Sequence, residues 1–256
     1  MQISDFFVDF CLKKHLSCYI ILNVKVNWLY FDLCYRGMKK MYKKYFKRLL
    51  DLFFAIILFI LTLPIVGVAS LIIFILDKGK SPLFKQQRVG KDEVKFNIYK
   101  LRTMAKDENG VNQVTKFGKI LRDTSIDELP QLINIIKGEM SFIGPRPWIS
   151  EYSKYFTKKD RRRSEVLPGL SGWAQVQGRN GITVKEKLRA DAWYVDHVTF
   201  KTDLTILLKT IELIFKRTGA SITETGIQNE LSELKESYYM TTDINENAQS
   251  IKERIG

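Results

Sequence analysis

The pattern of apolar and polar positions is dominated by one run, Leu52 to Leu76, which contains no charged residue. About 20 apolar residues are enough to cross the hydrocarbon core of a bilayer, so this run predicts a membrane helix. Basic residues crowd both of its ends, within 39–48 before it and 78–88 after it. Because positive charge favours the cytoplasmic side, both ends are predicted to face the cytoplasm.

The middle of the run can reconcile these two ends. Pro64 removes a helical hydrogen bond and can break the helix, and Thr62 beside it can bond a freed carbonyl where hydrocarbon supplies no partner. Gly67 follows shortly after. The sequence therefore predicts a re-entrant helix-break-helix anchor centred on Pro64. An ordinary kinked single span is the alternative.

The next stretch alternates between apolar and polar positions in two parts. Leu83–Val89 and Val94–Leu101 flank a turn-like sequence, Gly90 to Glu93, which predicts a small β-hairpin. Residues 105–113 look like an exposed loop. The polar face of the hairpin is either solvated or part of an anion-binding wall, and it carries Lys85, Gln87, Lys100 and Arg102.

The remaining pattern is mostly helical, which makes the predicted fold class α+β, mainly helical, with a monotopic membrane anchor. Helical period appears within 116–122, from Asp127 to a stop at Gly138, within 148–165 and near 183–195. A last amphipathic helix is predicted near 203–217. Its apolar face is predicted to be core or interface and consists of Leu204, Leu207, Leu208, Ile211 and Phe215.

Charge and composition narrow the class of partner. A net charge of +13 predicts an anionic one: nucleic acid, a membrane surface or a phosphorylated substrate. Trp148, Tyr152, Tyr155 and Phe156 precede the basic residues of 158–163, a mixture that suits a membrane interface or a nucleic-acid groove.

Cysteine and histidine usage excludes some chemistry. Cys11, Cys18 and Cys34 all fall in the first 34 residues, and none pairs with a histidine at metal-ligand spacing. No disulfide framework and no zinc site are therefore predicted. His15 and His197 are isolated and are predicted to be surface or packing residues.

Residue types suited to phosphate chemistry gather between Arg122 and Pro147. Asp127 and Glu128 stand side by side at the start of a predicted helix, and a helix N-terminus favours either a carboxylate or a phosphate held against it. The ordinary alternative is that Glu128 only forms a capping box with Ser125.

Arginines around this pair favour the chemical interpretation. Arg122 lies one short turn upstream, and Arg146 is held between two prolines that restrict the backbone. Arg179 ends a compact loop over 168–180 that is rich in glycine. Fixed guanidinium groups suit phosphate oxygens, so all three arginines are candidate phosphate ligands.

Four ordered segments together resemble the bacterial sugar transferases, the monotopic phosphoglycosyl transferases that start glycan assembly on a polyprenyl phosphate carrier. The resemblance covers about Met41 to Gly219. One departure is Leu63-Pro64, where the family often has Ser-Pro. The four segments are KRLLDLFFAIILF, QQRVGKDEVKFNIYKLRTM, LRDTSIDELPQLINIIKGEMSFIGPRP and PGLSGWAQVQGRN.

The resemblance implies a reaction and roles for residues. A sugar-1-phosphate would move from a UDP-sugar to undecaprenyl phosphate through a covalent phosphosugar-aspartyl intermediate on Asp127, with Glu128 as its dyad partner. These two carboxylates would also hold Mg²⁺. Arg122, Arg146, and Lys100 or Arg179 would bind phosphate oxygens, the carboxylate nucleophile being repelled until the phosphates are neutralised.

The resemblance also implies a location and a domain organisation. The enzyme would lie on the inner (cytoplasmic) membrane in contact with lipid, with its catalytic domain on the cytoplasmic face and no nucleic-acid partner, and would begin assembly of an exopolysaccharide, capsule or glycoprotein glycan. We expect an extension or mis-assigned start over 1–40, a basic segment and re-entrant helix over 41–78, the cytoplasmic catalytic domain over 79–219, and a loosely ordered polar tail over 220–256.

A rival interpretation has no catalysis. In it, a membrane-anchored basic protein binds acidic lipid or nucleic acid, and Asp127 and Glu128 only cap a helix. Replacement of Asp127 distinguishes the two, because it would abolish turnover in an enzyme and barely affect binding. A polytopic transferase is excluded, since one apolar segment cannot supply several spans.

Overall fold

The computed structural model describes residues 37–106, 110–178, 182–216, 231–236 and 238–239. The chain divides into two compact units, Met1–Phe46 and Lys47–Gly256. In the first unit the described residues are helical and end in a π-helical stretch, Tyr42–Phe46. The prediction of an extension over 1–40 falls largely outside the described residues. All features below belong to the second unit.

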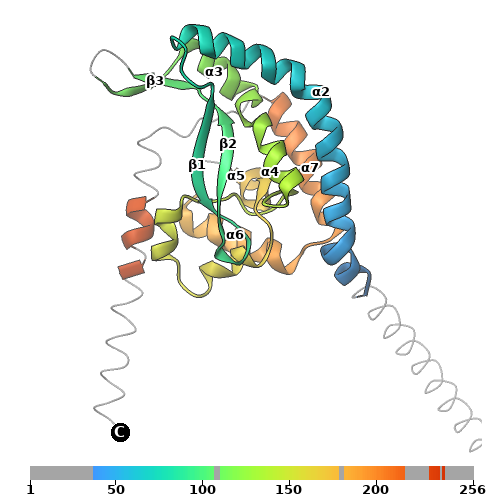
Figure 1. Ribbon diagram of the computed structural model, residues 1–256. Helices are drawn as coiled ribbons and strands as arrows, with labels where there is room; N and C mark the ends of the chain where they lie inside the picture. The colour runs from blue at the N-terminus through green and yellow to red at the C-terminus, as the bar shows by residue number, and fades with distance from the viewer. Residues whose placement is uncertain (1–36, 107–109, 179–181, 217–230, 237, 240–256) are drawn as a thin grey trace, which may run out of the picture. The chain divides into compact units, whose positions relative to one another are not determined.

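The long apolar run forms the helix α2 (Lys47–Leu76). It is part of a longer helix, Gly37–Leu76, whose length and composition are sufficient to cross a membrane. Only 11% of the most apolar 18-residue stretch of that helix is buried. Figure 1 shows that α2 bends sharply part-way along its length, yet it stays helical through Pro64. The missing N–H of Pro64 accounts for a bend without a break.

Thr62 has a different role from the one expected. Its hydroxyl donates to the carbonyl of Leu58 at 2.7 Å, whereas a proline at position 64 frees the carbonyl of Ile60, four residues before it. A threonine bonded to the carbonyl four residues back itself helps to bend a helix. The structure therefore has a bent continuous helix where a helix-break-helix was predicted.

Both halves of α2 pack against the rest of their unit. Ala55 in the first half is fully buried, and Ala69 and Ile73 in the second half are each 5% exposed. The small side chains of Ala55 and Ala69 let the neighbouring elements approach the helix closely, and Ile73 fills the space beside the second half. The two clusters are Ala55 with Phe96, Ile98, Leu132, Ile135 and Met140, and Ala69 and Ile73 with Leu101 and Leu121.

The predicted β-hairpin is confirmed. Strands β1 (Leu83–Val89) and β2 (Lys95–Leu101) pair antiparallel across a short 3₁₀ helix, η2 (Lys91–Glu93). Phe96 and Ile98 of β2 are buried, so one face of the hairpin belongs to the core. A second hairpin occupies part of the predicted loop and consists of β3 (Met104–Lys106) and β4 (Asn112–Val114).

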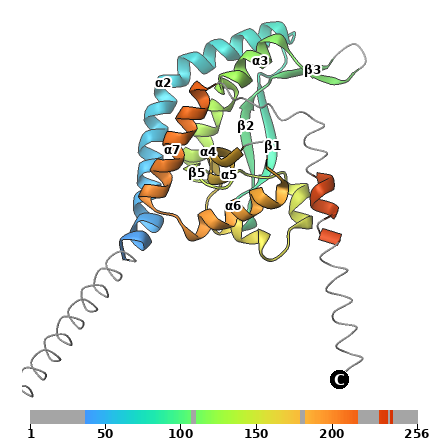
Figure 2. The same ribbon diagram turned by 180° about the vertical axis from the view of Figure 1, so that it is seen from behind.

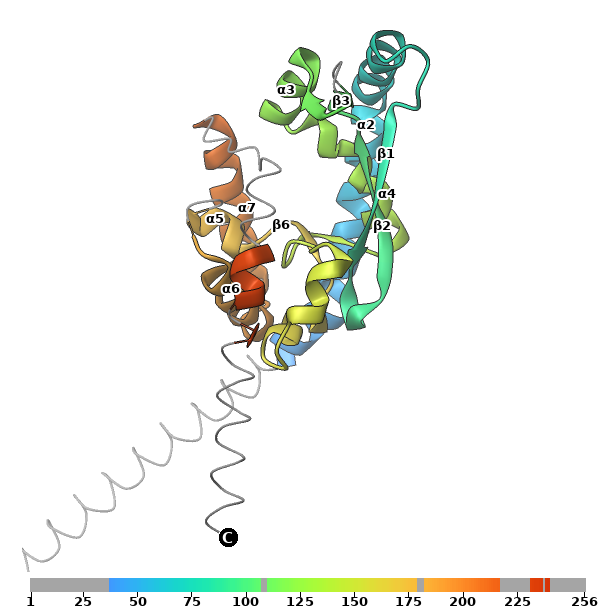
Figure 3. The ribbon, with the colours of Figure 1, turned by 90° about the vertical axis from the view of Figure 1, so that its left-hand side faces the viewer.

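The elements form two groups. Figure 3 shows α2, α4 and the β1–β2 hairpin on one side and α5, α6 and α7 on the other, and Figure 2 shows α6 and α7 on the side away from the hairpin. Their bounds are α3 (Lys116–Asp123), η3 (Ile126–Gln131), α4 (Leu132–Lys137), β5 (Ser141–Ile143), η4 (Ser150–Tyr155), η5 (Asp160–Glu165), β6 (Gly169–Ser171), α5 (Trp173–Gly178), α6 (Val184–Asp196) and α7 (Phe200–Phe215).

A parallel pairing of β5 with β6 joins the two groups. Three glycines make this junction, because the backbones touch. A Cβ on Gly169 would lie 2.1 Å from the nitrogen of Gly144, and one on Gly172 would lie 2.2 Å from the carbonyl oxygen of Gly144. Only residues without a side chain fit, so the glycines fix the turn that carries Arg146.

The segment 148–165 differs from its prediction. It is not one helix but contains two short 3₁₀ helices, η4 and η5. Trp148, Tyr152 and Phe156 are 8%, 4% and 4% exposed and form a core cluster with side chains of α6. The ring of Trp148 packs edge-on against those of Tyr152 and Phe156, with centroids 5.5 Å apart in both pairs. Assigning these aromatics to a membrane interface or a nucleic-acid groove was therefore wrong.

Helices α6 and α7 lie close to their predicted positions, but the apolar face of α7 is not core. Thr183 and Glu186 form a capping box at the start of α6. In α7, Ile206 is fully buried, whereas the predicted core face is exposed. The exposed fractions are 42% for Leu204, 43% for Leu207, 58% for Leu208 and 42% for Ile211. Of the two predictions for this face of α7, core or interface, only the interface remains.

Part of the predicted loose tail is ordered. Residues 231–236 are helical, and Leu234 is 2% exposed within the aromatic cluster of Trp148 and Tyr152. The backbone N–H of Val184 donates to Glu233 Oε1 at 3.1 Å. This piece of the tail therefore caps and covers α6. Most of the tail from 218 onward lies outside the described residues.

Gly169→Ala tests the backbone junction. We expect it to lower the free energy of unfolding by about 2–3 kcal/mol, because the added methyl overlaps the Gly144 backbone. Gly67→Ala is the control, since a Cβ there meets nothing within 4 Å. Denaturant unfolding of both variants in detergent measures the difference. Equal stabilities would contradict the proposed contact.

Candidate active site

Asp127 and Glu128 lie in the 3₁₀ helix η3, immediately before α4. Ser125 precedes them with a left-handed backbone (φ 57°), and its side chain makes no capping hydrogen bond. The left-handed residue turns the chain so that the capping box cannot close. The interpretation of Glu128 as a mere helix cap is therefore wrong, and its carboxylate is used elsewhere.

Two cations hold the carboxylate of Glu128. Lys100 Nζ of β2 donates to Glu128 Oε1 at 2.6 Å, and Arg146 Nη2 of the Gly-Pro-Arg-Pro turn donates to the same oxygen at 3.0 Å. Burial opposes the charge, but Arg146 and Lys100 outweigh it and hold the pKa of Glu128 well below its usual range. Glu128 is thus fixed as an anion.

Asp127 has the opposite environment. It is 7% exposed, and burial, followed by repulsion from Glu128, raises its pKa to about 6, against opposing effects of Lys100, Arg122 and Arg146. Two adjacent carboxylates are thereby given separate roles. At neutral pH Asp127 is mostly ionised. Its carboxylate is held less tightly than that of Glu128, which Lys100 and Arg146 both contact.

The predicted phosphate ligands are partly assembled here. Lys100 and Arg146 contact Glu128 directly. Arg122 lies near Asp127 and is oriented by Thr103, since Arg122 Nε donates to Thr103 Oγ1 at 2.9 Å. Arg179 lies outside the described residues.

The register between η3 and β2 is set by Asn134 of α4, which is fully buried. Its Oδ1 accepts from the Tyr99 N–H at 3.2 Å, and its Nδ2 donates to the Asn97 carbonyl at 2.7 Å. These bonds to the backbone of β2 place Lys100 opposite Glu128. The sequence did not single out Asn134, because an asparagine inside an apolar helix has no distinctive pattern.

The membrane helix supports the same region. Arg48 of α2 donates to the carbonyls of Ile135 at 2.5 Å and Ile136 at 2.9 Å. It thereby bonds carbonyls of the last turn of α4, where Gly138 terminates the helix with φ 85° and its own N–H also donates to the Ile135 carbonyl at 3.0 Å. Arg48, a basic residue before the apolar run, therefore supports the structure of the site, in addition to its predicted role in orienting the membrane helix.

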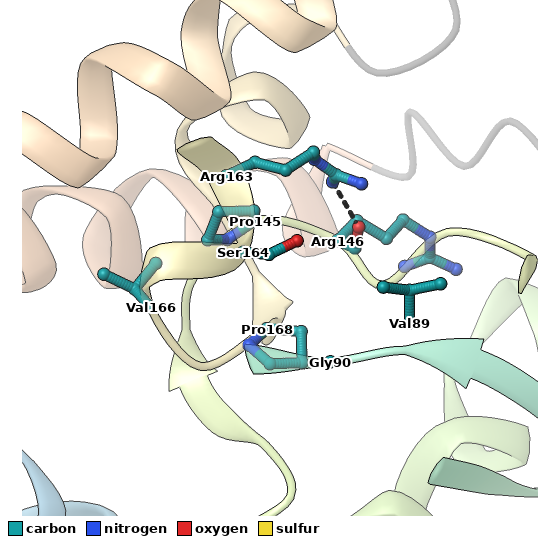
Figure 4. A pocket seen from close by; sticks show the side chains of 8 residues that line it. All are labelled: Val89, Gly90, Pro145, Arg146, Arg163, Ser164, Val166 and Pro168. Carbon is teal, nitrogen blue, oxygen red and sulfur yellow. Dashed lines mark hydrogen bonds between the residues drawn. The ribbon is translucent and has the colours of Figure 1, made fainter. Parts of the chain in front are cut away.

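Arg163 and Asp191 form a buried ion pair behind the site that the sequence analysis missed. Arg163 is 5% and Asp191 2% exposed, while the neighbouring Arg162 pairs with Asp196 at the surface. Figure 4 shows Arg163 and Arg146 on the lining of one small pocket. Three consecutive arginines predict a solvated surface, and nothing in the sequence distinguished the one that is buried.

The donor set of the dyad fits a magnesium ion. Mg²⁺ is usually held by one or two carboxylates together with water and substrate phosphates. Both hydrogen bonds to Glu128 end on Oε1, so Oε2 and the carboxylate of Asp127 can serve as ligands. Among the described residues no group of three or more His, Cys, Asp or Glu side chains could hold a metal without such substrate ligands.

Comparisons with known proteins show the family of this chain. A sequence model of the family described as bacterial sugar transferase matches residues 42–217. An uncharacterized sugar transferase, EpsL of Bacillus subtilis, is 41% identical over 180 residues, covering 68% of this chain and 89% of that protein. A UDP-glucose:undecaprenyl-phosphate glucose-1-phosphate transferase of Caulobacter vibrioides is 37% identical over 182 residues, covering 64% of this chain and 68% of that protein.

A longer relative matches as well. The undecaprenyl-phosphate galactose phosphotransferase of Salmonella typhimurium is 30% identical over 212 residues. The match covers 72% of this chain and 43% of that protein. The family match covers most of the chain, including α2 and every described residue of the site. This protein belongs to the bacterial sugar transferase family. It is a transferase of phosphorus-containing groups, as the resemblance of its four motifs implied.

Asp127→Asn is expected to stabilise the fold. Because the folded-state pKa of Asp127, about 6, lies above the ordinary aspartate pKa of 3.8, stability falls as pH rises between these values and stays low above about 6. The neutral variant avoids this loss, so it should gain up to ~3 kcal/mol at about pH 7.5 and much less near pH 4.5. Thermal unfolding in EDTA measures it. The exposed Asp123→Asn is the control, and an Asp127→Asn gain that does not depend on pH contradicts the buried charge.

Proposed function

We propose that this protein is a phosphoglycosyl transferase that moves a sugar-1-phosphate from a UDP-sugar to undecaprenyl phosphate. The names of its relatives, which are sugar-phosphate transferases acting on undecaprenyl phosphate, support the substrates. The observation that carries the chemistry is the buried carboxylate of Asp127, whose pKa is raised to about 6 beside three cationic side chains. A carboxylate that is ionised but poorly solvated is a competent nucleophile.

The reaction proceeds in two displacements at one phosphorus. An Asp127 carboxylate oxygen attacks the β-phosphorus, a P–O bond forms, and the bond from that phosphorus to the bridging oxygen breaks, so that UMP leaves with the electron pair. The phosphate oxygen of undecaprenyl phosphate then attacks the same phosphorus and releases Asp127. Undecaprenyl diphosphate sugar is the product, and no proton transfer to Asp127 is needed.

The cations around the dyad serve this reaction by neutralising charge. Two phosphates repel an anionic nucleophile, and transition-state charge spreads over the equatorial oxygens. Arg122 and Arg146 lie close enough to influence Asp127 electrostatically, so they and Lys100 are positioned to bind phosphate oxygens. Arg179 is proposed as a further ligand on sequence grounds alone.

Asp127 and Glu128 are also the proposed ligands of Mg²⁺. When bound there, the ion supplies positive charge that screens the diphosphate from the nucleophile. Glu128 is held by Lys100 and Arg146 with one oxygen only. The other oxygen accepts neither of these bonds and is the proposed metal ligand, which is the function we assign to the second carboxylate of the dyad.

We propose that α2 enters and leaves the membrane on the same, cytoplasmic, side of the inner membrane. A straight helix of 30 residues is roughly 45 Å long, which would separate its ends across a bilayer. Near the first end, Lys47 pairs with Asp203 at 2.5 Å, and just past the second, Asp77 pairs with Arg102 at 2.9 Å. These contacts of both ends with one unit support re-entry, and the basic residues at both ends of the run support a cytoplasmic location of the catalytic domain, 79–219.

The exposed face of α7 supports contact with lipid. Leu204, Leu207, Leu208 and Ile211 are all more than 40% exposed on one side of the helix. An amphipathic helix with such a face can lie in the interfacial region of a membrane. The Lys47–Asp203 pair links α7 to the start of α2, so both helices can meet the same bilayer.

Exchange of labelled UMP into UDP-sugar, without any lipid acceptor, tests the covalent step. We expect wild-type protein with Mg²⁺ to catalyse exchange with one sugar of a panel, and Asp127→Asn to lose it by about 10³-fold or more because the nucleophile is gone. Asp123→Asn, with an exposed carboxylate nearby, should retain exchange.

Two outcomes of this experiment exclude the proposal. Transfer to undecaprenyl phosphate without exchange would indicate direct displacement. Neither activity, in a folded protein that binds acidic lipid or nucleic acid, would favour the non-enzymatic alternative.

Cysteine labelling tests re-entry. In a protein whose Cys11, Cys18 and Cys34 are replaced by serine, Lys44→Cys and Lys80→Cys lie on either side of the apolar run. We expect a membrane-impermeant maleimide to label both from the cytoplasmic side of vesicles and neither from the other. Labelling of the two positions from opposite sides would establish a single span and exclude re-entry.

A further inference from the structure

The turn that carries Arg146 is held from behind by the buried guanidinium of Arg163. Arg163 Nε and Nη2 donate to Asp191 Oδ2 at 3.0 and 2.7 Å. The ring centroids of Trp148 and Phe156 lie 5.1 and 5.7 Å from its Cζ. The rings and the carboxylate leave the guanidinium little freedom, so it acts as a fixed donor.

Arg163 donates a further hydrogen bond toward the active site. Its Nη2 also donates to the main-chain carbonyl of Arg146 at 2.6 Å, the bond drawn in Figure 4. The Arg146 side chain reaches in turn to Glu128 Oε1 at 3.0 Å. A continuous set of contacts therefore runs from Asp191 of α6, through Arg163 and Arg146, to the dyad.

Stability alone does not explain a buried ion pair at this place. Replacing such a pair by apolar side chains of similar volume is often neutral or stabilising, and the surrounding cluster already contains aromatic residues. What an apolar side chain cannot supply is a directed hydrogen bond to the Arg146 carbonyl. The flanking prolines restrict that backbone but have no N–H with which to anchor it.

We propose that Arg163 is a positioning residue for the phosphate-binding arginine, Arg146, and that Asp191 holds Arg163 for this purpose. The inference rests on the proposed function, because it assigns Arg146 to the diphosphate of the donor. The Arg163 bond fixes where the Arg146 backbone lies, and hence where its guanidinium can meet both Glu128 and a phosphate. Arg163 itself contacts neither.

The test uses Arg163→Lys, which keeps the charge beside Asp191 but cannot bond the carboxylate twice and also reach the Arg146 carbonyl. Two readouts are measured in the full-length protein: UDP affinity by calorimetry in the presence of Mg²⁺, and the separate kcat and KM of UMP exchange. We expect UDP affinity to fall about tenfold and kcat/KM by about 10- to 100-fold, with the Tm within a few degrees of wild type.

Arg162→Met is the matched control. It removes the adjacent arginine, whose partner Asp196 is at the surface, and should leave both readouts unchanged. A double-mutant cycle with Arg146→Ala then separates positioning from general damage. If Arg163 acts through Arg146, Arg163→Lys adds no further loss of UDP affinity in the Arg146→Ala background.

Several results would overturn the inference. Wild-type UDP affinity in a folded Arg163→Lys protein excludes it, and so do losses that multiply in the double mutant. Should Arg163→Lys not fold, Asp191→Asn takes its place in the same cycle, and failure of both to fold makes the pair purely structural. UDP binding that depends on Arg146 and Arg163 without any sugar-phosphate transfer supports the inference while rejecting the proposed function.

Discussion

The structure of the site depends on the two cations that hold Glu128. Two adjacent carboxylates cannot both be buried as anions without compensation, since each raises the cost of ionising the other. Lys100 and Arg146 supply it from separate parts of the chain, the hairpin and the Gly-Pro-Arg-Pro turn. The hairpin register positions Lys100 and the glycine junction positions Arg146, so that both cations contact the same oxygen atom of Glu128. Asp127 is then left as the carboxylate with the perturbed pKa.

Local features were predictable from the sequence, and features set by burial were not. The hairpin sequence alternates with a period of two around a turn, so every predicted strand end lies within one residue of the observed end. Arg146 was recognised because the prolines beside it constrain the backbone. The predicted polar face of the hairpin was wrong: Lys100 shares a face with the buried Phe96 and Ile98, opposite Lys85 and Gln87, and is drawn there by the carboxylate of Glu128. The sequence misjudged α7 and Arg163, since which face of a helix or which of three arginines is buried depends on elements distant in the chain. The left-handed Ser125 was likewise invisible, because serine rarely adopts that backbone.

The membrane helix is part of the catalytic scaffold as well as an anchor. Arg48 donates to carbonyls in the last turn of α4, Ala55 and Ala69 lie in the cores beside β2 and α3, and Asp51 Oδ1 accepts from the N–H of Phe142 in β5 at 3.2 Å. A change in the tilt of α2 would therefore move the segment that follows the dyad. This coupling gives the charged residues Arg48 and Asp51 a structural role in the domain that follows α2, in addition to any role in orienting the anchor.

The pairing of Ser141 with Gly169 has a consequence for biosynthesis. A nascent chain emerges from its N-terminus, and domains tend to form in that order. The membrane helix is complete by Leu76, but the turn bearing Arg146 has no backbone to rest on until residue 169 is made, and Arg163 lacks its carboxylate until residue 191. A chain cut short after the dyad would therefore contain the complete apolar helix but lack both the strand and the carboxylate that hold the Arg146 turn in place.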